Sequence, residues 1–138
     1  MADSDLTPFF APRGIAVIGA SREPGKLGYF LARNLISSGY GGAVHLINPR
    51  GGTLLGREMI ASILDAPDPL DLAVILVPPG AVAASLRDCA TRGVKAVIVA
   101  AGGFREVGPE GAALEEECLR IARQAGIRMV GPNCVGLV

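Results

Sequence analysis

Short uncharged runs alternate along this chain with longer stretches in which apolar residues recur every three or four positions. The uncharged runs are rich in Val, Ile and Ala, a composition typical of parallel strands that are buried on both faces. They predict five strands, at residues 15–18, 43–48, 72–77, 96–100 and 127–130. Each predicted strand after the first runs directly into residues that favour turns, Pro or Gly among them.

The longer stretches predict amphipathic helices, because residues at this spacing share one helix face. The apolar faces are Leu27, Leu31 and Leu35; then Val82, Leu86, Cys89 and Ala90; and then Leu114, Cys118, Ile121 and Ala125. Gly39 and Gly126 are expected to end the first and the last helix. The segment 54–64 has a weaker pattern and is expected to form a short helix after the second strand.

This alternation predicts an α/β, Rossmann-like fold with an open, parallel five-stranded sheet and helices on both faces. The 138 residues suit a single domain, 1–138, and half of them are hydrophobic, so a sizeable core can form. Aromatic residues are only 4%, so that core is expected to be aliphatic. Phe9 and Phe10 are expected to pack an N-terminal arm onto it. The sequence ends at GPNCVGLV, directly after the fifth strand, which suggests a domain of a longer protein.

Charge and hydropathy narrow the classes of partner. The chain has 13 basic and 13 acidic residues and no net charge, whereas a nucleic-acid groove or a membrane-surface patch needs a basic excess. No apolar run approaches the roughly 18 residues that span a bilayer, and residues 1–14 do not resemble a secretory signal. A cytoplasmic protein that contacts neither nucleic acid nor membrane is therefore expected.

Metal chemistry is not expected either. Cys89, Cys118 and Cys134 are far apart without a CxxC spacing, and the chain has one histidine, so a zinc site of the usual type is not predicted. We expect three reduced thiols. His45 lies between two apolar residues of a predicted strand. We expect it to be a structural residue.

Residues 14–28, GIAVIGASREPGKLG, carry the main functional signal. A buried strand leads into Gly19, Ala20 and Ser21, and Gly25 and Gly28 then open the following helix. Small residues at such a turn leave backbone N–H groups accessible, and the start of a helix attracts anions. We therefore expect a phosphate-bearing ligand here.

The known phosphate motifs match only in part. A dinucleotide fingerprint needs GxGxxG and an acidic residue that ends the second strand; here GKLG completes only half of it, and Asn48-Pro49-Arg50 ends the strand. An arginine there favours a ribose phosphate, which both NADP and coenzyme A carry. A Walker motif fails because Leu27, and not Ser or Thr, follows Lys26.

Five pieces of sequence then carry a resemblance to a family. They are FFAPRGIAVIGAS, INPRG at 47–51, DLAVILVPP, AAGGF and GPNCVGL, and together they extend over essentially the whole chain. In this order and spacing the chain resembles the N-terminal coenzyme A (CoA)-binding domain of NDP-forming acyl-CoA synthetases, relatives of the α subunit of succinyl-CoA synthetase. It departs at Arg50, where relatives usually have Lys, which keeps the charge.

The resemblance implies a CoA site at the carboxyl ends of the strands. The first loop and Arg50 would meet the phosphates, Val77-Pro78-Pro79 would border the adenine, and the end of the fourth strand would follow the pantetheine arm. The implied ligand-binding residues are Gly19, Ala20, Ser21, Arg22, Gly25, Lys26, Gly28, Asn48, Arg50, Val77, Pro78, Pro79, Val99, Ala100, Ala101 and Asn133. Asn133 can equally be read as a turn-stabilising amide.

No complete catalytic site is expected within the chain. The family transfers its phosphoryl group through a histidine of a later domain, so the resemblance implies further domains or a partner subunit that complete a ligase. Glu106 and Glu110 could form an acid/base pair, but a solvated loop is the favoured interpretation, as is a solvated face for 115–117, early in the last helix. The alternatives are a CoA-sensing module without chemistry, including the regulatory domain of a protein acetyltransferase, and an NADP-dependent oxidoreductase domain.

Overall fold

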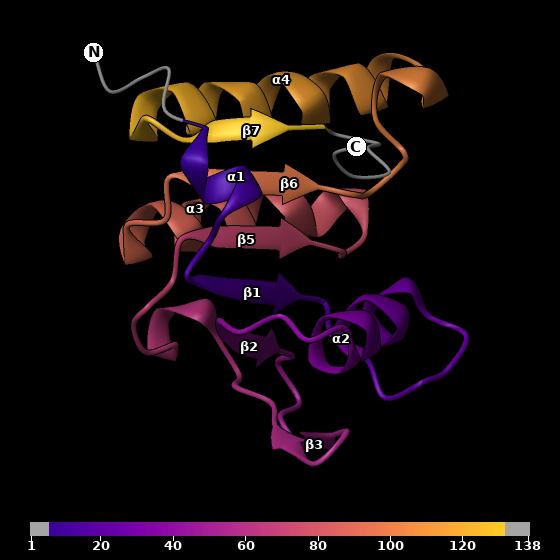
Figure 1. The fold of residues 1–138 in the computed structure, drawn as a ribbon. Coiled ribbons are helices and arrows are strands. Elements are labelled where there is room, and N and C mark those ends of the chain that lie inside the picture. The colour runs from indigo at the N-terminus through magenta and orange to yellow at the C-terminus, as the bar shows by residue number, and fades with distance from the viewer. Residues whose placement is uncertain (1–5, 132–138) are drawn as a thin grey trace.

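A computed structural model describes residues 6–131 of the 138. Its main sheet has five strands in the order β2-β1-β5-β6-β7, and every neighbouring pair is parallel. Figure 1 shows the strands side by side, all pointing the same way. The strands are β1 (Gly14–Ile18), β2 (Ala43–Ile47), β5 (Leu72–Ile75), β6 (Ala96–Val99) and β7 (Arg128–Val130).

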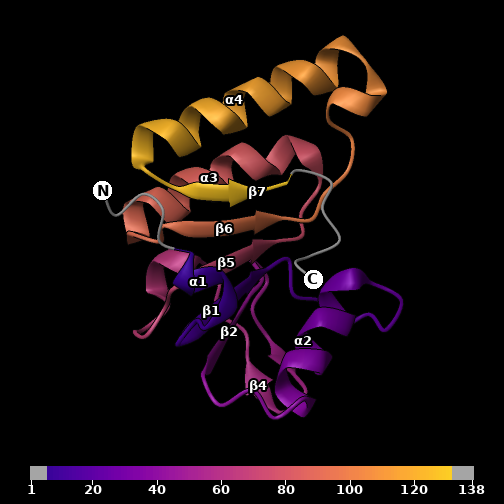
Figure 2. The same ribbon diagram turned by 45° about the horizontal axis from the view of Figure 1, so that its top comes forward.

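The helices lie in two layers, one on each face of the sheet. The four-residue α1 (Thr7–Phe10) and α2 (Leu27–Ser37) cover one face, while α3 (Pro79–Arg92) and α4 (Pro109–Ala125) cover the other (Figure 2). Parallel strands need such crossover connections, which place the helices over the sheet. The predicted Rossmann-like fold, with an open five-stranded sheet between helices, is confirmed.

Alternate residues of the strands supply separate cores on the two faces. Ala16 and Ile18 of β1 pack with α3, α4 and their neighbours, whereas Val17 packs with Ala32 of α2. Ile15 lies in a third cluster with Phe9 of α1. The expected aliphatic core is present, and of the two phenylalanines expected to hold the arm, Phe9 is buried whereas Phe10 is exposed.

Four of the five predicted strands are shorter in the structure, although the N–H groups of Leu76 and Ala100 still bond to the neighbouring strands. β2, β5 and β6 end at Ile47, Ile75 and Val99, one or two residues early, and β7 starts one residue late. On α2 the prediction is partly wrong: Leu27 is exposed, and the small residues Gly28 and Ala32 form the buried contact. Leu31 and Leu35 pack at the edge of the core as predicted.

The helix expected at 54–64 is wrong. Instead β3 (Thr53–Leu54) and β4 (Arg57–Glu58) form a small antiparallel hairpin, and a 3-10 helix, η2 (Ile63–Asp65), follows. Leu55 and Gly56 join the two strands with φ of 53° and 78°, which are the positive angles of a type I′ turn. Apolar spacing gave no sign of this hairpin, because its strands are two residues long.

α4 begins earlier than the charge pattern indicated. It starts at Pro109, so residues 115–117 lie in its middle and not near its positive end. These carboxylates instead form ion pairs: Glu115 and Glu116 with Arg105 of the 3-10 helix η3 (Arg105–Val107), and Glu117 with Arg87. The predicted apolar faces of α3 and α4 do pack into the core, and Gly126 ends α4 with φ of 69°.

The buried polar residues behave as expected of structural groups. His45 is buried in β2, and its Nε2 lies 3.0 Å from the Pro69 carbonyl oxygen. Cys89 and Cys118 are free, buried thiols on α3 and α4; Cys134 lies outside the described residues. Among the helices of residues 6–131, none is both long and apolar enough to cross a membrane.

Arg13 and Asp71, which directly precede the adjacent strands β1 and β5, are joined by hydrogen bonds. Arg13 donates from Nε and Nη2 to the two carboxylate oxygens of Asp71, at 2.9 and 2.8 Å, and its backbone N–H donates to the same side chain. These hydrogen bonds lower the pKa of Asp71. The stabilisation is therefore present above the ordinary carboxylate pKa and is lost as the pH falls through the lower pKa of the folded state.

We expect Asp71→Asn to lower the thermal unfolding midpoint at pH 7 by a few degrees, as an exposed ion pair contributes modestly. The difference from the unmodified protein should shrink as the pH falls below the ordinary carboxylate pKa, and it should vanish below the lower pKa of the folded state, where the wild-type carboxylate is protonated as well. Thermal unfolding followed by circular dichroism between pH 7 and pH 3 measures this. Glu58→Gln, at an exposed carboxylate of β4, is the control; an equal shift in both variants would contradict the assigned role of Asp71.

Candidate functional site

The candidate site lies where the chain order in the sheet reverses. The chain leaves β1 for β2 on one side and then returns to β5 on the other side of β1. Loops at the carboxyl ends of these two strands diverge to opposite faces, which opens a crevice where ligands bind in α/β sheets. Two cavities lie there, of about 440 and 250 Å³, and Gly19 after β1 and Val77 after β5 line both.

The larger cavity, which we call the loop cavity, brings together most of the predicted ligand-binding residues. Its lining includes Gly19, Ala20, Ser21, Lys26, Gly28, Asn48, Val77, Pro78 and Ala100. Leu27 and Leu76 also line it, although sequence reasoning assigned Leu27 to a helix core and Leu76 to a strand. Residues from four separate strand ends thus meet at one site, as the parallel topology requires.

The first loop is closely packed against its neighbours. Gly19 has φ of 100°, and a side chain there would overlap the carbonyl of Leu76. A Cβ at Gly28 would overlap the carbonyl of Gly19, so the first turn of α2 rests directly on the loop. The two glycines are therefore required by backbone contacts within the protein.

Only some of the backbone donors expected in this loop are free. The N–H groups of Gly19 and Ala20 both donate to the carbonyl of Ile47, at 3.1 and 3.2 Å, so they are not available. Within residues 6–131, the N–H groups of Ser21 and Arg22 have no acceptor, and neither do those of Leu27 and Gly28 in the first turn of α2. The accessible donors therefore lie two residues further along the loop and at the helix start.

These donors give the loop cavity a positive character. The amino end of α2 carries the positive end of the helix dipole, and no side chain caps it. Lys26 is the one charged residue among those of the described chain that line the cavity. The Ser21 hydroxyl accepts a hydrogen bond from the N–H of Glu23 at 3.1 Å, which leaves its own proton free to donate. This arrangement suits an anion.

Asn48 connects the second loop to the first. Its Nδ2 donates to the Ala20 carbonyl at 2.8 Å, and its Oδ1 accepts from the N–H of Arg50 at the same distance. Its amide is thus used within the protein, which indicates that it positions both loops. The guanidinium of Arg22 lies beside Gly52, in the turn that follows Arg50. Both arginines are exposed, and neither lines the loop cavity.

The remaining predicted residues fall into two groups. Pro79 and Gly25 do not line either cavity. Pro79 begins α3 and contacts Gly103 in the loop between β6 and η3, which we call the fourth loop. Val99 is completely buried in the core and Ala101 nearly so, which leaves Ala100 as the part of that strand end that reaches the cavity. Asn133 lies outside the described residues.

Glu106 holds the fourth loop and is not arranged as a catalytic acid or base. Its carboxylate accepts hydrogen bonds from backbone N–H groups, including that of Gly103, and these lower its pKa. Such a carboxylate remains ionised near neutral pH and cannot serve as a general acid there. No ion pair or hydrogen bond joins it to Glu110 among the described residues, which supports the interpretation as a solvated loop.

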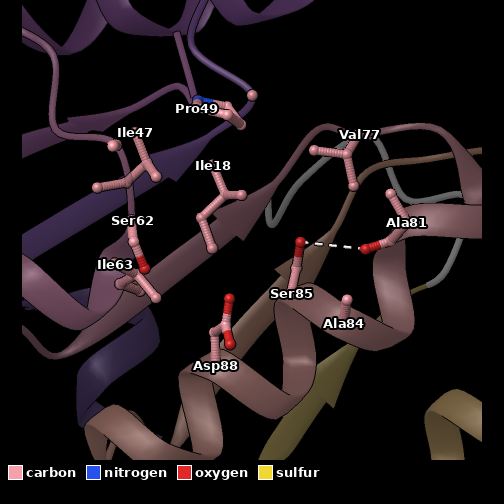
Figure 3. A pocket seen from close by; sticks show the side chains of 12 residues that line it. Ile18, Ile47, Pro49, Ser62, Ile63, Val77, Ala81, Ala84, Ser85 and Asp88 are labelled. Atoms are coloured by element: carbon pink, nitrogen blue, oxygen red, sulfur yellow. Dashed lines mark hydrogen bonds between the residues drawn. The ribbon is translucent and has the colours of Figure 1, made fainter. Parts of the chain in front are cut away.

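The smaller cavity, which we call the α3 cavity, lies on the other face of the sheet (Figure 3). Sequence reasoning missed it. Ala81, Ala84, Ser85 and Asp88 face it from α3 at positions i, i+3, i+4 and i+7, and β1, β2 and the segment through η2 supply the opposite wall. A stripe of small side chains at this spacing was the available signal. Most of the wall is apolar, including Ile18, Ile47, Pro49 and Val77.

Within residues 6–131 no cluster of three His, Cys, Asp or Glu residues could hold a metal ion.

Cys89 follows Asp88 on α3, and burial together with that negative charge raises the pKa of the Cys89 thiol to about 12. A thiol with such a pKa stays protonated near neutral pH and is a poor nucleophile. The arrangement therefore supports binding of an anionic ligand and offers no assembled nucleophile.

Comparison with known proteins assigns the chain to a family. The family model described as "CoA binding domain" matches residues 13–138. The α subunit of the ADP-forming acetate–CoA ligase I of Pyrococcus furiosus is 42% identical over 137 residues, which cover 96% of this chain and 30% of the relative.

Solved structures agree. A protein of Pyrococcus horikoshii OT3 has a TM-score of 0.91 at 44% identity, with 96% of this chain and 30% of that chain covered. The dinucleotide-forming acetyl-coenzyme A synthetase 1 of Ca. Korarchaeum cryptofilum, solved with phosphate and ADP, has a TM-score of 0.88 at 44% identity; 94% of this chain and 27% of that chain are covered. The chain thus spans about 30% of the length of these three relatives.

The contact between α2 and the first loop can be tested with two glycines. Gly28→Ala should lower the free energy of unfolding by about 1–3 kcal/mol, because the new methyl group has to displace the Gly19 carbonyl. Gly25→Ala should change it by less than about 0.5 kcal/mol, since nothing lies within 4 Å of its Cβ position. Urea unfolding of both variants measures the difference, and equal stabilities would refute the close packing of the loop.

Proposed function

Because this chain belongs to the CoA-binding domain family found in ADP-forming acyl-CoA synthetases, we propose that it binds CoA at the carboxyl ends of β1 and β5, across the loop cavity and the α3 cavity. The single observation that carries this proposal is the pair of cavities with a shared wall at Gly19 and Val77. One is positive through Lys26 and free backbone N–H groups, and the other is mostly apolar. CoA has the same division, with a polyanionic centre between an aromatic base and a long arm.

The phosphates occupy the loop cavity in this proposal. The free N–H groups of Ser21 and Arg22, those at the start of α2, and the ammonium group of Lys26 receive the diphosphate. Arg50 and Arg22, on adjacent loops that Asn48 connects, meet the outer phosphates. Gly25 adds no side chain to the loop. The glycine-rich loop thus acts through the donors of its second half.

The two ends of CoA leave this centre in different directions. The adenine enters the α3 cavity, where Val77 and Pro49 offer apolar surface. The pantetheine arm follows Pro78 and Ala100 along the edge of the sheet, with Pro79, Val99 and Ala101 supporting these positions from behind.

The chain acts in a larger enzyme as its CoA-binding domain, with residues 1–138 as one unit. The Pyrococcus furiosus α subunit is about three times longer, and the expected phosphohistidine belongs to another domain or a partner subunit. The complete ligase would convert acyl-CoA, a nucleoside diphosphate and phosphate into the acid, CoA and the nucleoside triphosphate, or run in reverse. CoA is then a substrate of the whole enzyme that this chain holds.

Titration calorimetry of this chain with CoA, dephospho-CoA and NADPH tests the proposal. CoA should bind more tightly than dephospho-CoA, and Arg50→Ala should weaken CoA binding by about 1–3 kcal/mol, because it removes a charged partner of a phosphate. The fold should be unaffected, since the Arg50 side chain is exposed at a turn.

Arg120→Ala is the matched control, as Arg120 is an exposed arginine on α4, away from both cavities. Binding of NADPH without binding of CoA would replace the proposal with the dinucleotide alternative. Equal affinities for CoA and dephospho-CoA would show that Arg50 does not contact the 3′-phosphate.

A further inference from the structure

Asp88 is an unusual residue of the α3 cavity. Its side chain points from α3 into the cavity, toward Ser62 and Ile18 on the opposite wall (Figure 3). Of the described residues that line this cavity, only Asp88 carries a charge. A half-buried carboxylate in mostly apolar surroundings is costly unless it has a partner.

The neighbouring cations do not supply that partner. Arg92 lies one turn along α3 but donates to Asp68, at 2.7 Å, and to the carbonyl of Ala66. Arg87 donates to Glu117 of α4 at 2.8 Å. Within residues 6–131, Asp88 makes no ion pair and no side-chain hydrogen bond. Its carboxylate oxygens therefore remain as acceptors that face the cavity.

The serines of the cavity add to this excess of acceptors near α3. Ser85 donates its hydroxyl proton to the Ala81 carbonyl at 3.2 Å, so toward a ligand it presents lone pairs (Figure 3). On the opposite wall, the Ser62 hydroxyl accepts from the N–H of Leu64 and keeps its proton free. The α3 wall thus requires hydrogen-bond donors from a ligand, and its negative charge repels phosphate.

We propose that Asp88, assisted by Ser85, determines the base specificity of this site by accepting hydrogen bonds from an exocyclic amino group. The inference rests on the proposed CoA function and deepens it. A purine with a 6-amino group offers N–H donors and an apolar ring to this cavity, whereas a 6-oxo purine would place an oxygen against the carboxylate. The opposite charges of Lys26 and Asp88 in the two cavities also fix which end of the ligand enters which cavity.

The test compares CoA with its deaminated analogue, in which hypoxanthine replaces adenine. The unmodified protein should bind CoA at least about tenfold more tightly, because the analogue leaves the half-buried acceptor unpaired. Asp88→Asn should weaken CoA binding and reduce the preference to about threefold or less, since its amide can donate to the 6-oxo group. Asp65→Asn, at an exposed carboxylate of η2 outside the cavity, should keep the full preference.

The outcomes separate this inference from the function on which it rests. Equal binding of CoA and the analogue by the unmodified protein would overturn the role of Asp88 and leave CoA binding intact; this comparison needs no variant to fold. An unchanged preference in Asp88→Asn, with an unchanged unfolding midpoint, would also overturn it. Absence of CoA binding in the unmodified protein would overturn the proposed function and this inference together.

Discussion

The structure depends on the pairing of β1 with a parallel strand on each side. β2 pairs along the whole of β1, and β5 along all of it except Gly14. Gly14 and Gly19 bracket it, and a side chain at either would overlap a backbone carbonyl of the segments leading to or from β5. Because the chain departs from β1 to one side and returns on the other, the loops after β1 and β5 separate. Both cavities are a consequence of that reversal.

Charge distribution then gives the two cavities different electrostatic character. The loop cavity collects N–H groups, a helix amino end and Lys26, whereas the α3 cavity has Asp88 and serine lone pairs in an apolar wall. The pattern of arginine pairing maintains this difference. Arg87 and Arg92 are held by Glu117 and Asp68 and do not neutralise Asp88. A ligand with an anionic centre and a neutral aminated base matches both sides, which is the physical basis of the proposed CoA orientation.

The loops of the site are positioned mainly by contacts within the protein. Asn48 holds the first and second loops together through both ends of its amide, and Gly103 contacts Pro79 while Glu106 fixes its N–H. Several residues that resemble ligand contacts in the sequence are thus engaged with the protein itself. The resemblance to a family predicts where a ligand binds, but the hydrogen-bond partners decide which atoms are free to bind it.

The sequence by itself determined the strand order along the chain, the two-sided burial of the sheet and the small-residue loop after β1, because these depend on local composition and periodicity. The resemblance to a family, and not periodicity, grouped Gly19, Ser21, Lys26 and Asn48 as one site. Tertiary structure decided that Leu27 is exposed, that 54–64 forms a hairpin, that the N–H groups of Gly19 and Ala20 bond to Ile47, and that Asp88 faces a cavity. Those outcomes depend on which distant segments pack together, and residue periodicity carries no information about the partner across the contact.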